Sequence, residues 1–343
     1  MNIKKIEEKV LKCYQDINPS FYGIENDEIF KNLFSQRKTI YQNLQLLPYL
    51  YKAKKILEIG GGTGEKALIN QIISGADITI VDMNNFALER AKLLFKQYGK
   101  KVKCINKSIF QLKKKDFSGY DLVICEGVIH HTADPLSCLN LICDFMDSNS
   151  MLLLAMAEKN GWYQRQLQRN FVRSGCENDK EKIFRRAKKF FSLHLKRAVK
   201  FGLRSEESVI NDTFVNPQIK VTPIEKIIST FKRHNIFYIS SFPTLHMFSH
   251  EKPINQNINN SYKFSIPKIH LKLLKLLWRT GYSKPINFFD KNKYKKLMLL
   301  DRKLKTLEID IKNDRLLPRH LNLIQVGPLS YGMNYFFVYK DKK

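Results

Sequence analysis

The stretch that most constrains the fold of this chain is Ile56-Leu-Glu-Ile-Gly-Gly-Gly-Thr-Gly-Glu65. It begins with the apolar content of a short buried strand, continues through a glycine turn at residues 60 to 64, and leads into residues 65 to 73, whose apolar positions have helical spacing. Glycines admit close backbone approach, and the first N–H groups of a helix point outward. The stretch therefore predicts a cradle for a nucleotide, and the alternative is a packing turn that binds no ligand.

The spacing of the glycines indicates which nucleotide. Gly60, Gly62 and Gly64 read G-x-G-x-G, whereas a dinucleotide fingerprint requires G-x-G-x-x-G, whose last position here is Glu65. With Glu58 in front, the stretch reads E-x-G-x-G-x-G and resembles motif I of the class I, Rossmann-like S-adenosylmethionine-dependent methyltransferases. The resemblance implies S-adenosyl-L-methionine as cofactor and an α/β fold, with a doubly wound, seven-stranded, mostly parallel sheet.

The rest of the chain supplies the segments that such a fold needs. Besides the first strand, the composition predicts strands at 77–83, 102–106, 151–157, 237–242 and 333–339, and another at the start of 120–135. Residues 1–50 are expected to form an N-terminal helical cap, and residues 51–242 with 333–343 the methyltransferase domain, including a basic helical lid at about 160–203. Residues 243–332 are expected to form a helical insertion before the last strand, because so long a connection is usually functional or a small subdomain.

Several residues follow as candidates for cofactor binding. Asp82 ends the second strand 22 residues after Gly60, where a carboxylate can accept both ribose hydroxyls; the alternative is that it caps the next helix. Its neighbour Met83 is included in the site. The resemblance also implies that Glu58 orients the glycine loop from beneath and that Glu126 lies near the methionine end of the cofactor.

One position departs from the family pattern. Family members often carry an aspartate shortly after the third strand to bind the adenine amino group, but here the chain has Ser108 followed by Ile109. We expect both residues to lie beside the adenine. A hydroxyl can still hydrogen-bond the edge of the base, so the departure weakens one contact without removing the site.

The stretch from Tyr120 to Pro135 predicts a strand, a loop and a helix that begins at Asp134-Pro135. With its adjacent His130 and His131 it resembles the fourth motif of the same family. Either histidine can have a structural role, with one ring bonded to a backbone carbonyl, or can accept a proton from the substrate nucleophile. We prefer His131 to His130 as the base. No metal is expected, because adjacent side chains diverge.

A second candidate base is Asp212, in a turn-rich segment, 212–217, that we expect to be a loop near the carboxyl edge of the sheet. The sequence also has a formal charge of +27, from 59 basic and 32 acidic residues. Such a charge suits nucleic acid, an anionic membrane face or a phosphorylated substrate, and it equally suits a surface solvated by lysines. The basic amphipathic segment 268–279 is expected either to contact a membrane surface or to pack on its own domain.

The N-terminal residues lack the apolar core of a signal peptide, and no run of 18 apolar residues is present. The six cysteines contain no C-x-x-C pair, which predicts reduced thiols in a cytoplasmic protein, with contact to the inner membrane face as an option. The function expected is an enzyme that methylates an oxygen or nitrogen of a small-molecule, sugar or lipid-linked acceptor. The alternatives are an RNA methyltransferase and a non-catalytic, cofactor-binding or membrane-associated scaffold.

Overall fold

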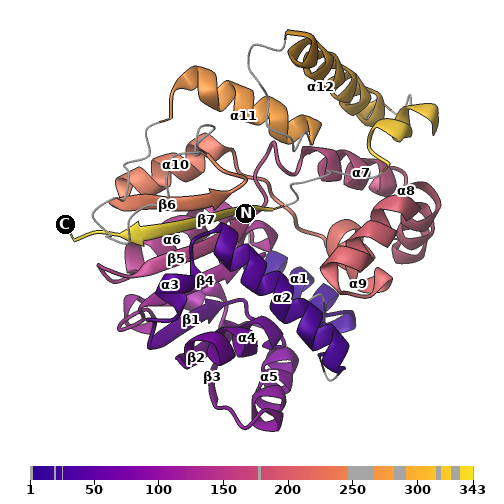
Figure 1. Ribbon diagram of the computed structural model, residues 1–343. Helices are drawn as coiled ribbons and strands as arrows, with labels where there is room; N and C mark the ends of the chain where they lie inside the picture. Colours follow the sequence, from indigo (N-terminus) through magenta and orange to yellow (C-terminus); the bar gives the residue numbers. More distant parts are fainter. Residues whose placement is uncertain are drawn as a thin grey trace. The chain divides into compact units, whose positions relative to one another are not determined.

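The chain folds into two compact units (Figure 1). The computed structural model describes residues 3–18, 21–24, 26–176, 179–245, 266–281, 291–313, 318–325 and 333–342. Unit 1 comprises Met1–Met156, Gln218–Ile266 and Asn334–Lys343, and unit 2 comprises Ala157–Pro217 and Pro267–Met333. The expected lid and most of the expected insertion therefore belong to the same unit. Residues 246–265, 282–290, 314–317 and 326–332 of the insertion lie outside the described residues.

Unit 1 contains a seven-stranded sheet in the order β3-β2-β1-β4-β5-β7-β6. The first five strands pair in parallel, and β7 runs antiparallel between β5 and β6. Figure 1 shows β7 in yellow beside β6. This topology confirms the doubly wound, mostly parallel sheet expected from the sequence. The strands are β1 (Lys55–Ile59), β2 (Asp77–Asp82), β3 (Val102–Asn106), β4 (Leu122–Glu126), β5 (Met151–Met156), β6 (Ile236–Phe242) and β7 (Asn334–Lys340).

The central strands are apolar because helices cover both faces of a doubly wound sheet. In β4, Leu122 to Cys125 are all buried, and in β5 so are Leu152 to Met156. Three helices of unit 1 begin at side-chain caps: the side chains of Asn26, Asn84 and Asp134 accept hydrogen bonds from the first turns of α2, α5 and α6. These elements are α1 (Ile3–Asp16), α2 (Asp27–Asn43), α3 (Leu47–Leu50), α4 (Glu65–Ser74), α5 (Asn85–Gln97), α6 (Pro135–Phe145) and α10 (Ile224–Arg233), with short turns η1 (Ile109–Gln111), η2 (Lys114–Asp116) and η3 (Ile129–His131).

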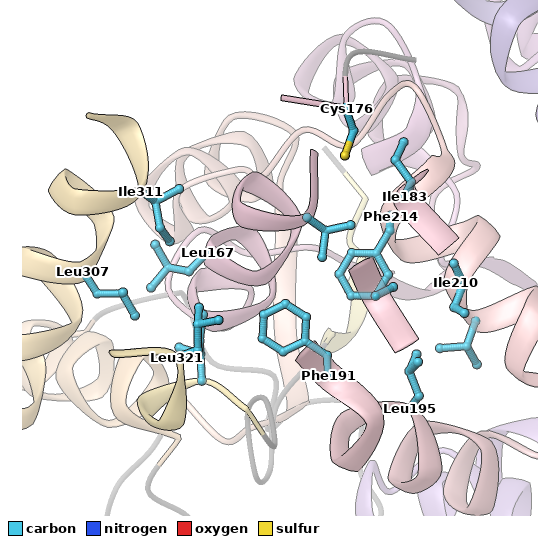
Figure 2. Packing of buried hydrophobic residues seen from close by; sticks show 14 of the residues in the cluster. Leu167, Cys176, Ile183, Phe191, Leu195, Ile210, Phe214, Leu307, Ile311 and Leu321 are labelled. Atoms are coloured by element: carbon cyan, nitrogen blue, oxygen red, sulfur yellow. The ribbon is translucent and has the colours of Figure 1, made fainter. Parts of the chain in front are cut away.

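Unit 2 is helical in its described part and has a hydrophobic core of its own. Side chains from well-separated segments meet there, among them Leu167, Phe191, Phe214 and Leu307 (Figure 2). Helix α8 is kinked at Phe191, whose ring stacks on that of Phe214 with a centroid distance of 6.2 Å. The elements are α7 (Tyr163–Arg173), α8 (Lys180–Gly202), α9 (Glu206–Ile210), the π-helical turn η4 (Asn211–Val215), α11 (Lys268–Thr280), α12 (Lys291–Lys312) and η6 (Pro318–Leu323).

The basic amphipathic segment is α11, for which packing on its own domain was one of the two expectations. Leu274, Leu276 and Trp278 in its second half are buried, which confirms that this half packs within unit 2. The first turn is open to solvent, with Ile269 at 79% exposure. Across the described ranges, none of the helices combines the length and apolar content needed to span a bilayer.

Candidate active site

The glycine turn has the backbone conformation that the motif predicts. Gly60, Gly62 and Gly64 have φ values of +70°, +55° and +85°, in the left-handed region that side chains disfavour. A Cβ on Gly60 would lie 2.2 Å from Val128 Cγ2, and one on Gly64 would lie 2.8 Å from Ala91 Cβ. These two glycines are therefore required by the packing of the protein itself, as well as by any ligand that the turn receives.

The carboxylate of Asp82 lies beside this turn. Its Oδ2 accepts a hydrogen bond from Gly62 N at 2.9 Å, and its Oδ1 accepts one from Asn84 N at 2.8 Å. The cap of the next helix is the side chain of Asn84, so capping does not account for Asp82. Burial raises the pKa of Asp82, and the backbone N–H groups oppose that rise. A carboxylate beside the glycine turn suits a ribose diol, because its oxygens accept hydrogen bonds from hydroxyl groups, and the half-buried Met83 lies next to it in the chain.

A buried chain of hydrogen bonds runs from the end of β4 to β1. Both oxygens of Glu126 accept from the guanidinium of Arg37 on α2, at 2.9 and 2.5 Å. Arg37 also donates to Tyr41 Oη at 2.5 Å, Tyr41 donates to Asn70 Oδ1 at 2.5 Å, and Asn70 donates to Glu58 Oε2 at 3.3 Å. Glu58 of β1 is therefore hydrogen-bonded to α4, and its role in orienting the glycine loop stays a prediction.

The surroundings along this chain of hydrogen bonds shift the pKa values of Glu58 and Glu126 in opposite directions. Burial, together with the nearby charge of Glu126, raises the pKa of Glu58 to about 7. Burial acts in the same direction on Glu126, but the positive charges of Arg37 and Lys66 outweigh it and lower the pKa of that carboxylate. The side chains of Arg37 and Glu126 are only 3% and 4% exposed, so their ion pair is desolvated.

These residues fit S-adenosylmethionine. Charged groups of both signs, namely Arg37, Lys66 and Glu126, lie together in unit 1, which suits the ammonium and carboxylate of the methionine end. The Asp82 carboxylate beside the glycine turn suits the ribose. The sequence alone did not reveal the pairing of Arg37 with Glu126, because the two residues are 89 positions apart.

Ser108 follows β3 and begins the short turn η1, in which Ile109 is buried. Its Oγ accepts from Phe110 N at 3.2 Å, and its N–H donates to Gln111 Oε1 at 2.8 Å. The Ser108 hydroxyl itself donates to Glu7 Oε1 on α1. The sequence pattern gave no signal for Glu7, which is one of several charged residues on an amphipathic helix.

His130 and His131 form a buried turn directly after β4. His131 Nδ1 lies 3.0 Å from the backbone oxygen of Gln218. A carbonyl oxygen can only accept, so Nδ1 carries the proton in the neutral ring and Nε2 is the unprotonated nitrogen. The ring of Tyr14 lies edge-on to His131 at 5.7 Å, and the two histidine rings are 4.1 Å apart. His131 can therefore have a structural role through Nδ1 and a role as general base through Nε2 at the same time.

Asp212 is not in a loop, contrary to the prediction for residues 212–217. Helix α9 continues directly into the π-helical turn η4, which contains Asp212, and Asp212 Oδ2 accepts from Arg204 Nη1 at 3.2 Å. The turn forms because the segment contributes buried residues such as Phe214 to the core of unit 2. Since Asp212 belongs to unit 2 and the histidines to unit 1, its role as a base stays a prediction.

Comparison with known proteins agrees with this geometry. The family model described as a methyltransferase domain matches residues 50–298. The ubiquinone biosynthesis O-methyltransferase of Nitrosospira multiformis is 27% identical over 109 residues, which cover 31% of this chain and 44% of that protein. Its counterpart from Salmonella paratyphi A is 27% identical over 108 residues, covering 32% and 44%. The matched segment thus spans less than half the length of either relative.

Among solved structures, PKMT2 from Rickettsia typhi is similar with a TM-score of 0.47 and 14% identity, over 86% of this chain and 50% of that one. An S-adenosylmethionine-dependent methyltransferase from Clostridium acetobutylicum is similar with a TM-score of 0.30 and 16% identity, over 39% and 52%. The family model covers more than half of the present chain, and the sheet order and glycine turn agree with it. The chain therefore belongs to the methyltransferase-domain family, as a class I, Rossmann-like, S-adenosylmethionine-dependent member.

Proposed function

We propose that this protein transfers the methyl group of S-adenosylmethionine to a hydroxyl oxygen of a small-molecule or lipid-linked acceptor, with His131 as the general base. The observation that carries the proposal is the bond between His131 Nδ1 and the Gln218 carbonyl, which makes Nε2 the unprotonated, basic nitrogen of the neutral ring. The oxygen acceptor is supported by the names of the relatives, which are O-methyltransferases.

The proposed methyl transfer is a direct displacement, so the protein does not need to form a covalent intermediate. S-adenosylmethionine, when bound, would supply a methyl group on a positively charged sulfur, and that sulfur would keep the electron pair of the carbon–sulfur bond as the carbon–oxygen bond forms. A neutral hydroxyl is a weak nucleophile, so His131 Nε2 takes its proton during the transfer. The fixed ring orientation, set by Gln218 and Tyr14, holds that nitrogen in place and reduces the entropy lost in reaching the reactive geometry.

The chain's own residues hold the two ends of the cofactor in this proposal. Asp82 accepts the ribose hydroxyls, and the charged groups Arg37, Lys66 and Glu126 receive the methionine end. The ion pair of Arg37 and Glu126 is buried, so solvent and salt screen its attraction to the charges of the ligand less than they would screen a contact at the surface. The positions of both cofactor ends then determine where the methyl group lies relative to the acceptor oxygen.

The test separates chemistry from binding. His131→Ala should lower kcat by about 100-fold or more, because general-base catalysis typically contributes that much. Its affinity for S-adenosylhomocysteine, measured by calorimetry, should stay within about twofold of the original. An equal loss of turnover and cofactor affinity would identify His131 as a structural residue only.

The acceptor class is tested with methyl-labelled S-adenosylmethionine and cell extract separated into small molecules, lipids, glycans and RNA. Label that appears as a methyl ether in the small-molecule or lipid fraction supports the proposal. Label in RNA, with binding that weakens steeply as salt is raised, would replace it by the RNA methyltransferase alternative. Binding of S-adenosylhomocysteine without any labelled product would favour the non-catalytic alternative.

A further inference from the structure

The turn after β3 lacks a carboxylate of its own, and helix α1 brings one to it. Ser108 is buried, and its hydroxyl donates to Glu7 Oε1, although the two residues are 101 positions apart. Both belong to unit 1. Glu7 is half-buried, and among the described residues its second oxygen, Oε2, accepts no hydrogen bond. A carboxylate only accepts, so this oxygen is available to a donor on a ligand.

The sheet order indicates which part of the cofactor reaches this place. Asp82, at the end of β2, marks the ribose, and the charged groups for the methionine end gather around Glu126 at the end of β4. In the order β3-β2-β1-β4, the base must extend from the ribose in the direction opposite to β4, which is toward β3. Strand β3 ends at Asn106, paired with Asp82, and Ser108 follows two residues later.

Helix α1 also contacts the other end of the site. Tyr14 packs edge-on against His131, and Glu7 meets Ser108. Seven residues of helix separate Glu7 from Tyr14, a rise of about 10 Å along the axis. The helix therefore lies along the site from the turn after β3 to the histidine turn.

We infer that Glu7 of helix α1 is the hydrogen-bond acceptor for the 6-amino group of adenine, in the place where the turn after β3 offers only the Ser108 hydroxyl. The inference rests on the cofactor in the proposed function. Glu7 Oε2 accepts a hydrogen bond from the amino group while Oε1 keeps its hydrogen bond from Ser108. The serine thus positions the carboxylate, and the carboxylate recognises the base.

The experiment measures the selectivity of the full chain for adenine. Affinities are determined by calorimetry for S-adenosylhomocysteine and for S-inosylhomocysteine, in which an oxygen replaces the 6-amino group. The unmodified chain should prefer the adenine ligand by at least about tenfold, because the carboxylate loses its donor and faces an acceptor in the analogue. Equal affinities for the two ligands would overturn the inference without any substitution.

The variant Glu7→Gln keeps the size of the side chain and adds an amide donor. It should lower the preference for adenine by about tenfold, partly by improving the fit to the inosine oxygen. Glu8→Gln, at the exposed neighbouring position of the same helix, is the matched control and should leave the preference unchanged. Glu7→Leu, which offers neither donor nor acceptor, should weaken the adenine ligand and affect the analogue by no more than about twofold.

The outcomes separate this inference from the proposed function. If Glu7→Gln weakens both ligands equally, Glu7 only docks α1, and the inference is wrong. If the preference for adenine is unchanged in both Glu7 variants, another group reads the base, the inference is again wrong, and methyl transfer to a hydroxyl still stands. If the unmodified chain binds neither ligand, the cofactor assignment fails, and the proposed function fails with it.

Discussion

The two units of this protein differ in where their charged side chains lie and in how many basic residues they contain. In unit 1, the ion pair of Arg37 with Glu126 is almost completely buried, with side chains only 3% and 4% exposed. Unit 2 holds 29 of the chain's 59 basic residues but only 12 of its 32 acidic ones. In the part of unit 2 that the structure describes, most of the basic side chains are exposed. The net charge of +27 is therefore concentrated in the unit that lacks the glycine turn, and it gives little information about the cofactor site.

Two arginines of unit 2, Arg169 and Arg173, bond to backbone carbonyl groups instead of to a carboxylate. Arg169 Nη1 donates to the backbone oxygens of Thr213 and Phe214 at 2.9 and 3.1 Å, and Arg173 Nη1 donates to those of Phe214 and Val215. These bonds satisfy carbonyl groups at the π-helical turn η4. Arg169 and Arg173 thus stabilise an irregular backbone in unit 2, whereas Arg37 in unit 1 is paired with a carboxylate near the proposed ligand.

The largest effect that would test this division comes from the core of unit 2. Phe191→Ala removes a fully buried ring that stacks on Phe214 and should lower the free energy of unfolding by about 3–5 kcal/mol. Urea denaturation would measure the loss. If the cofactor is held by unit 1, the affinity for S-adenosylhomocysteine should change by less than about twofold at temperatures where the variant stays folded.

A control on the same helix is Phe201→Ala. Its ring is 63% exposed, so the stability should change by no more than about 0.5 kcal/mol. A large loss of cofactor affinity in Phe191→Ala, but not in Phe201→Ala, would contradict the assignment of cofactor binding to unit 1 alone.

A smaller effect, dependent on pH, is expected in unit 1. The pKa of Glu58 is about 7 in the folded protein and near 4.5 in the unfolded chain, so between these values the folded state holds a proton that the unfolded chain has lost. Glu58 therefore costs no stability below about pH 4.5, costs more as the pH rises to about 7, and reaches a constant cost on the order of 2–3 kcal/mol above that.

The substitution Glu58→Gln should remove that cost. The amide oxygen of glutamine can still accept from Asn70 Nδ2, and it carries no charge. The variant should be more stable than the original at pH 8 and nearly equal to it at pH 4.5, as followed by urea denaturation across this range. A difference in stability that does not vary with pH would show that Glu58 is ionised in the folded state throughout.

The smallest effect concerns binding rather than stability. Asp82→Ala removes a charge-assisted contact to the ribose and should weaken the binding of S-adenosylhomocysteine by about 1–3 kcal/mol, measured by calorimetry. Asp82→Asn keeps an oxygen that can accept from Gly62 N, so it separates the charge from the shape of the loop. Unchanged affinity in both variants would remove Asp82 from the ribose site.

The sequence was most informative where the signal is local. Six of the seven strands were predicted to within one residue at each end, and the fourth was placed in the correct stretch, because apolar runs between turn residues are typical of buried strands. The glycine turn and the position of Asp82 beside it were also predictable, since both depend on a spacing of about 20 residues.

The contacts that the sequence did not predict join distant segments. Arg37 meets Glu126, and Glu7 meets Ser108, across 89 and 101 residues. Helical periodicity places such side chains on a face of α1 or α2 but not against a particular turn of the sheet. The segment around Asp212 was predicted to be a loop for a related reason: its polar residues resemble a turn, and the burial of Phe214 in unit 2 overrides that local preference.

The position of β7 has a consequence for how the protein is made. This strand lies between β5 and β6, but it follows them in sequence, after a segment that contributes α11 and α12 to unit 2. During synthesis the edges of β5 and β6 stay unpaired until residues 334–340 leave the ribosome. Unpaired edges can pair with other chains, so the newly made protein is exposed to aggregation until those seven residues arrive.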